Sequence, residues 1–135
     1  MTRRYLLDSG PASDFLFKRK GVDQRVERIK RAGAKIGICI PVLGEILGGL
    51  EASASRVASL ALARRYLGKL VCWPYDRAAA QEYGRIFAEL KKRGRIIQQI
   101  DTQIAAIALT LGDCTVVSYD GGLAGVPGLT VENWS

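Results

Sequence analysis

Arg4-Tyr5-Leu6-Leu7-Asp8-Ser9-Gly10-Pro11 is the stretch that decides the fold class, because a short apolar run meets an acid and then a turn. A run of about four to eight residues that ends in this way is typical of a buried strand. Further β-rich runs follow at 35–40, 69–73 and 114–119, and a shorter one lies at 129–131. The sequence therefore predicts four strands and a short fifth.

Helical patterns fill the intervals between these runs. Ser13 is a candidate N-cap for a helix over 14–18, and a second helix is expected over 22–32, where Gly33 ends it. The remaining helices are expected at 42–50 behind Pro41, at 53–67, at 77–93 behind the N-cap Asp76, and from about 101 to 111. This alternation predicts a three-layer α/β sandwich with a mainly parallel central sheet.

The size and composition of the chain fit one domain that spans residues 1–135. A chain of this length with 48% hydrophobic residues can bury a single core. Its apolar runs stay well below the roughly 18–20 residues that a membrane-spanning helix needs. The apolar stretch near the N-terminus ends at Asp8, which argues against a signal peptide, so we predict a cytoplasmic protein without a membrane partner.

The chain has no histidine, and this absence excludes several kinds of chemistry. Ser-His-Asp catalysis, Cys-His catalysis and histidine-ligated zinc are all removed. The three cysteines lie far apart in apolar segments, so we expect small buried side chains and neither a disulfide framework nor a zinc site. The net charge of +7, from 20 Lys and Arg against 13 Asp and Glu, favours a polyanionic partner.

Four acids stand on the side of the predicted sheet where ligands bind. Ligands of parallel α/β folds lie outside the carboxyl ends of the strands. Asp8 ends the first predicted strand and Asp120 ends the fourth, while Glu45 follows the second strand by five positions. Asp101 begins a helical stripe that is otherwise apolar, with Ile104, Ala105, Ala108 and Leu111 on the same face.

Each of these acids also has an ordinary structural explanation. Asp8 and Asp120 suit turns, Asp101 suits a helix N-cap, and Glu45 suits the positive end of a helix. Gathered together, however, four carboxylates would raise one another's pKa values unless a cation neutralised them. Oxygen ligands of this kind suit Mg²⁺ or Mn²⁺, and metal-assisted cleavage of a phosphodiester needs no histidine.

The order and spacing of several short motifs resemble those of a known family. The matching segments are Tyr5-Leu6-Leu7-Asp8-Ser9, Ile40-Pro41-Val42-Leu43-Gly44-Glu45-Ile46-Leu47-Gly48-Gly49, Asp101-Thr102-Gln103-Ile104-Ala105-Ala106 and Val117-Ser118-Tyr119-Asp120, with weaker matches at 73–80 and 126–134. Through these segments, which cover nearly the whole chain in order, the sequence resembles the PIN-domain ribonuclease toxins of the VapC type.

The resemblance implies a PIN-like α/β fold whose acidic pocket binds Mg²⁺ or Mn²⁺ and cleaves single-stranded or loop RNA, often tRNA. Carried over to this sequence, Asp8 and Asp101 are the expected main metal ligands. Glu45 and Asp120 are expected to complete the catalytic set, directly or through water. Ser9 and Ser118 match hydroxyl residues that help to orient the site.

The chain departs from the family at two places. The family usually has Asn after the first hydroxyl residue, and this chain has Gly10. The usual Asn-Asp-x-Asp-Phe stretch reads Tyr119-Asp120-Gly121-Gly122-Leu123. The central set of Asp8, Glu45 and Asp101 keeps the family pattern.

The resemblance also implies protein partners, namely a second copy of the chain in a homodimer and a cognate VapB-like antitoxin. Such antitoxins lay a helix in an apolar groove, for which 15–17 together with Leu43, Leu47 and Leu50 are candidates, although most of these residues are expected in the core. Three basic clusters, at 18–20, 30–31 and 91–93, are ordinary solvated charges or RNA contacts, and our hypothesis is that at least one rims the acidic pocket.

A metal-dependent endoribonuclease toxin is the leading interpretation, and other functions share parts of the pattern. One is a catalytically weakened PIN-fold protein that binds RNA or regulates, and another is a DNA nuclease or RNA-processing protein with the same chemistry. A phosphatase that uses Asp8 as its nucleophile would need a second Asp two residues on, where this chain has Gly10.

Overall fold

The protein, seen in a computed structural model that describes residues 2–135, is built on a five-stranded sheet in the order β3-β2-β1-β4-β5. All neighbouring strands run parallel, so the predicted α/β architecture is confirmed. The strands are β1 (Arg4–Leu7), β2 (Lys35–Cys39), β3 (Val71–Trp73), β4 (Cys114–Val117) and β5 (Thr130–Glu132).

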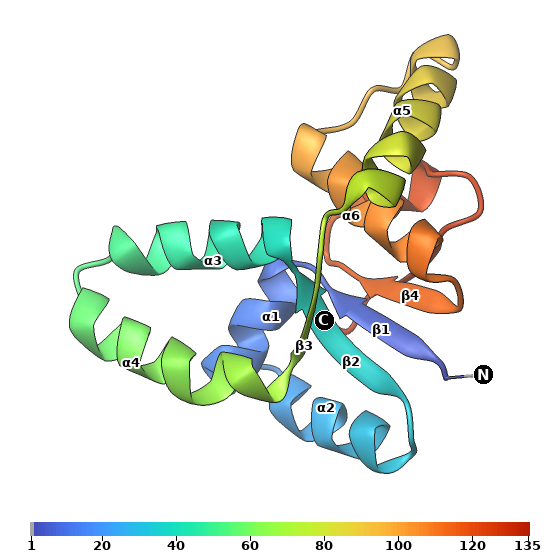
Figure 1. The fold of residues 1–135 in the computed structure, drawn as a ribbon. Helices are drawn as coiled ribbons and strands as arrows, with labels where there is room; N and C mark the ends of the chain where they lie inside the picture. Colours follow the sequence, from blue (N-terminus) through green and yellow to red (C-terminus); the bar gives the residue numbers. More distant parts are fainter. Residues whose placement is uncertain (1) are drawn as a thin grey trace.

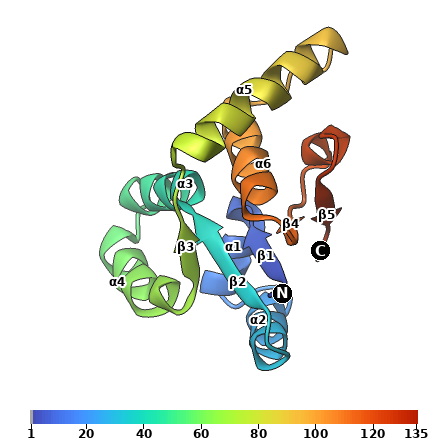
Figure 2. The same cartoon turned by 45° about the vertical axis from the view of Figure 1, so that its right-hand side comes forward.

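Helices cover both faces of this sheet. They are α1 (Ser9–Leu16), α2 (Val22–Arg31), α3 (Ile40–Glu51), α4 (Arg56–Tyr66), α5 (Arg77–Lys92) and α6 (Gln99–Leu111), with short 3₁₀ segments η1 (Leu67–Lys69) and η2 (Gly121–Gly125). Figures 1 and 2 show α5 and α6 together on one side of the sheet and α1 and α2 on the other. None of the helices in residues 2–135 combines the length and apolar character needed to span a membrane.

The core lies along the two central strands. Leu6 and Leu7 of β1 and Val116 and Val117 of β4 are completely buried, because helices cover both of their faces. This double burial explains why the strands read as continuous apolar runs rather than alternating ones. Ile104 of α6 is also completely buried and belongs to the same core. The rigid centre of the sheet therefore ends directly at Asp8 and Ser118.

The first and fourth helices depart most from their predicted starts. The first helix begins at Ser9 rather than behind Ser13, with Asp8 as its N-cap, so Ser9-Gly10-Pro11 forms a first helical turn instead of a loop. Pro11 is tolerated there because proline has no backbone N–H, and the N–H groups of the first turn have no carbonyl partner within the helix. The fourth helix begins at Arg56 rather than at 53.

The cysteine prediction is wrong at one position. Cys39 is buried and Cys114 is partly buried, and burial raises the pKa of both thiols to about 12. Cys72 is exposed. It lies on β3, the edge strand of the sheet, where its neighbour Val71 is also 39% exposed.

A glycine in β2 allows the strand to approach β3 closely. A Cβ atom at Gly37 would lie 2.1 Å from the carbonyl oxygen of Val71, its register partner. We expect Gly37→Ala to lower the free energy of unfolding by about 2 kcal/mol, since the obstructing atom belongs to the main chain and cannot turn aside. Urea denaturation measures this change. Gly48→Ala is the control because its Cβ would meet nothing within 4 Å, and an equal loss in both variants would contradict the steric explanation.

Candidate functional site

The carboxyl ends of β1 and β4 form the candidate site. These two strands are neighbours, with Leu7 paired with Val117, but the chain continues from β1 to β2 on the other side. Such a switch in strand order is the usual ligand position in a parallel sheet. Asp8 follows β1 directly, and Ser118 and Asp120 follow β4. The topology therefore brings together side chains that are more than a hundred residues apart in sequence.

Asp8 is held by hydrogen bonds to both of its carboxylate oxygens. The Ser9 N–H donates to Oδ1 at 2.8 Å, and the Ser118 hydroxyl donates to Oδ2 at 2.9 Å. The Asp120 N–H in turn donates to Ser118 Oγ at 3.1 Å. Burial raises the pKa of Asp8, and these two hydrogen bonds offset part of that increase. Ser118 thus connects the two strand ends and fixes the orientation of Asp8.

Asp101 is a buried acid without a protein hydrogen-bond donor in the described part of the chain. It lies in the first turn of α6 and is 6% exposed, on a face where Ile104, Ala105 and Ala108 are also buried. It is not the N-cap, because the helix begins two residues earlier at Gln99. Burial, together with the charges of Asp8, Asp120 and Glu45, raises the pKa of Asp101 to about 6. An acid in this environment is stabilised when a proton or a cation neutralises its charge.

Glu45 and Asp120 approach the same region from more exposed positions. Glu45 is exposed on α3 and lines a cleft of about 380 Å³ with Ser9, Gly10 and Gly49. The Asp120 carboxylate accepts a hydrogen bond from the Gly122 N–H at 2.9 Å. A Cβ at Gly122 would lie 3.5 Å from an Asp120 oxygen and 3.9 Å from an Asp101 oxygen, so Gly122 keeps the space between these two carboxylates open.

The charges of these four acids remain uncompensated by protein cations. None of the ion pairs within residues 2–135 involves Asp8, Glu45, Asp101 or Asp120. Among the same residues, no three acidic or cysteine side chains lie close enough to hold an ion as they stand. The oxygen donors suit a hard divalent cation such as Mg²⁺ or Mn²⁺.

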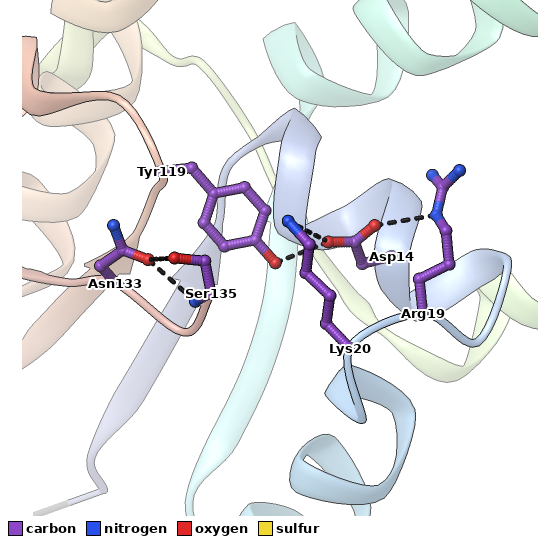
Figure 3. A network of polar contacts seen from close by, with 6 residues as sticks. All are labelled: Asp14, Arg19, Lys20, Tyr119, Asn133 and Ser135. Carbon is purple, nitrogen blue, oxygen red and sulfur yellow. Dashed lines mark hydrogen bonds and ion pairs between the residues drawn. The ribbon is translucent and has the colours of Figure 1, made fainter.

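Asp14 was not among the site residues predicted from the sequence, and the structure places it close to this region. Asp14 is 6% exposed, and its Oδ2 accepts a hydrogen bond from the Tyr119 hydroxyl at 2.7 Å. Arg19 donates to its Oδ1 at 2.9 Å, and Lys20 Nζ lies 3.7 Å from its Oδ2 (Figure 3). The signal for this network in the sequence was that Gly10 and Tyr119 both depart from the family pattern. In the structure the Tyr119 ring lies against Gly10.

The structure separates the basic clusters by their distance from the acids. Lys20 Nζ lies 4.3 Å from the centre of the ring of Tyr119, the residue before Asp120, whereas Lys18 Nζ lies over the ring of Tyr66. Lys91 and Lys92 lie at the end of α5 that is farthest from the sheet (Figure 1). Among the candidate groove residues, Phe15, Leu16 and Leu50 are buried in the core, whereas Phe17 and Leu47 are 38% and 36% exposed.

Comparisons with known proteins agree in fold and in length. The PIN domain family matches residues 5–129. The tRNA(fMet)-specific endonuclease VapC of Shigella flexneri is 31% identical over 132 residues, which cover 98% of each chain. Ribonuclease VapC2 of Haemophilus influenzae is 28% identical over 131 residues, covering 97% of this chain and 98% of the relative.

Solved structures of toxin–antitoxin complexes have the same fold. A chain of DNA-bound VapBC from Salmonella typhimurium superimposes with a TM-score of 0.89 at 25% identity, covering 100% of both chains. A chain of VapBC2 from Rickettsia felis, bound to a fragment of its promoter DNA, gives 0.90 at 23% identity and covers 98% of this chain and 99% of that one.

Proposed function

The chain belongs to the PIN domain family as a ribonuclease of the VapC type, and from this membership we propose that it cleaves RNA with a divalent cation held by its four clustered carboxylates. The observation that carries the proposal is Asp101, a buried carboxylate with no hydrogen-bond donor among residues 2–135 and a pKa raised by burial and by three neighbouring acids. A bound Mg²⁺ or Mn²⁺ supplies the missing positive charge. The assignment of the site residues rests on this electrostatic argument and on the family pattern.

We assign distinct roles to the residues of the site. Asp8 and Asp101 are the main ligands, and Ser118 keeps Asp8 in its orientation through the hydrogen bond at 2.9 Å. Glu45 and Asp120 complete the set, directly or through water, and Ser9 supports Asp8 through its N–H. When bound, the divalent cation activates water and neutralises charge on the scissile phosphate. The absence of histidine fits this chemistry.

Transfer RNA is the substrate class that we propose to test first. The Shigella relative is named for its action on tRNA(fMet), and the net charge of +7 favours binding to a polyanion. Within the 18–20 cluster, Lys20, which lies against Tyr119, is the residue that we propose as a contact to the RNA backbone. Since tRNA is a cytoplasmic substrate, we place the protein in the cytoplasm.

We further propose that a VapB-like antitoxin binds this protein and that the chain forms a homodimer. The support is that similar solved structures are VapBC complexes. The exposed side chains of Phe17 and Leu47 are candidates for an apolar contact with the antitoxin. One domain, residues 1–135, carries both the nuclease site and these contacts in our proposal.

Cleavage of purified tRNA tests the proposed activity. We expect discrete fragments from total tRNA in Mg²⁺ or Mn²⁺ and no fragments in EDTA, because the acids require the cation. Denaturing gels and end-mapping of the fragments measure the reaction. Tight RNA binding without cleavage in either metal would favour a binding-only protein. Cleavage of DNA but not RNA would indicate a DNA nuclease.

A further inference from the structure

The connection between β4 and η2 is fastened to α1 at two points. Ser118 donates a hydrogen bond to Asp8, the N-cap of α1. Tyr119, the next residue, reaches further along the same helix and donates to Asp14 Oδ2 at 2.7 Å. Figure 3 shows the tyrosine ring directed toward Asp14, with Lys20 and Arg19 completing the network around that carboxylate. Asp120 follows immediately after these two anchors.

The second anchor depends on the glycine at position 10. A Cβ there would lie 3.0 Å from Tyr119 Cδ2 and 3.4 Å from Cε2, so the ring lies directly against the Gly10 main chain. A larger residue would push the ring away from the helix and from Asp14. The departures from the family pattern at Gly10 and Tyr119 are therefore complementary, since the small residue provides the space that the ring occupies.

The Tyr119 contact is strong for a half-buried phenol. Its acceptor is a carboxylate that is 6% exposed, and hydrogen bonds to charged acceptors are roughly twice as strong as neutral ones. Lys20 Nζ lies 4.3 Å from the ring centre and 3.7 Å from Asp14 Oδ2, which holds both partners from the solvent side. On the other side of Asp120, Gly121 and Gly122 carry no side chains, and the next fixed point is Leu123 of η2, which is completely buried.

We propose that Tyr119, through its hydrogen bond to Asp14 across Gly10, is a positioning residue that sets the Asp120 carboxylate opposite Asp101. This inference rests on the proposed metal-dependent function. Asp120 is exposed, and its own contacts are local ones to Ser118 and Gly122. Asp120 lies between two fixed points, Tyr119 before it and the buried Leu123 after it, so the Tyr119 anchor sets one of the two ends that place the carboxylate. Tyr119 thereby influences metal affinity without touching the metal.

Mn²⁺ binding to the metal-free full chain tests this role. We expect Tyr119→Phe to weaken Mn²⁺ affinity about tenfold, the lower end of the range for outer residues that orient a metal site. The Mn²⁺ concentration for half-maximal tRNA cleavage is expected to rise by the same factor, while the rate at saturating Mn²⁺ changes little. Titration calorimetry measures the affinity. Tyr83→Phe on α5 is the matched control and is expected to bind Mn²⁺ like the original protein.

Asp14→Ala and the double variant Asp14→Ala, Tyr119→Phe separate the hydrogen bond from general damage. If the Tyr119–Asp14 hydrogen bond is the cause of the lower affinity, the double variant has the same Mn²⁺ affinity as the single variant that binds Mn²⁺ less tightly. A lower Tm in Tyr119→Phe with unchanged Mn²⁺ affinity would show a merely structural role and overturn the positioning proposal, leaving the proposed function intact. If the original protein itself binds no Mn²⁺, the proposed function fails as well.

Discussion

Asp101→Asn is expected to lower the rate of RNA cleavage by at least about 100- to 1000-fold, the range observed when one electrostatic contribution to a transition state is lost. The substitution keeps the shape of the side chain and removes its charge. Asp101 is 6% exposed, lies near three other acids and pairs with no cation among residues 2–135, so its charge is available to a bound metal ion. Asp8→Asn is expected to have an effect of similar size. Single-turnover cleavage of tRNA in Mg²⁺ measures both.

The control for this experiment is Asp113→Asn, which changes the net charge by the same amount. Asp113 is exposed in the turn before β4, at the opposite end of that strand from Asp120, and its φ of 42° is one that Asn adopts readily. Equal losses in Asp113→Asn and Asp101→Asn would assign the effect to net charge alone. An Asp101→Asn protein that cleaves at the original rate would remove Asp101 from the catalytic set.

The strands and the acids at their ends were predictable from sequence because their signals are local. A buried parallel strand is a short apolar run, and the acids at 8 and 120 mark where β1 and β4 leave the core. Asp101 was recognisable because it interrupts an apolar helical stripe that the structure shows to be buried. These features depend on periodicity within a few residues, which a sequence displays directly.

The start of α1 was not predictable, because the same residues serve two structures. Ser9-Gly10-Pro11 suits a turn, and it equally suits the first turn of a helix in which Pro11 needs no hydrogen-bond acceptor. The hydrogen bond from the distant Ser118 hydroxyl holds the Asp8 carboxylate where it caps the helix. A competition between two local structures of similar energy is settled by such tertiary surroundings.

The Asp14 network was not predictable for a different reason. Tyr119 and Asp14 are 105 residues apart, and their contact depends on the parallel register of β1 with β4 and on the direction of α1. Sequence analysis registered Gly10 and the Tyr119 segment as two separate departures from a family pattern. The structure shows them to be one steric arrangement, because the ring occupies the space beside the glycine.

Metal-free protein is expected to lose stability relative to Asp101→Asn as the pH rises from about 4 to above 6. In the folded state the pKa of Asp101 is raised from 3.8 to about 6, mainly by burial. The folded protein therefore binds this proton more tightly than the unfolded chain does. The resulting stabilisation is fully present below pH 3.8 and is lost as the pH rises through about 6. Above that pH, Asp101→Asn should be more stable by about 1 kcal/mol, after allowance for solvent screening.

A divalent cation should make the original protein more stable than Asp101→Asn, because the cation neutralises the negative charge of Asp101. At pH 7.5 and a Mn²⁺ concentration of 100 times Kd, the original protein should gain about 2.7 kcal/mol, whereas Asp101→Asn should gain far less. The gain should shrink as the pH falls through about 6, since Mn²⁺ then competes with the proton on Asp101. Urea denaturation between pH 5 and 8, in EDTA and in Mn²⁺, measures both effects. Equal stabilisation of the two proteins by Mn²⁺ would show that the cation binds away from Asp101. If Asp101→Asn were the less stable protein in EDTA above pH 6, the charged carboxylate would be stabilised by the folded protein without a metal.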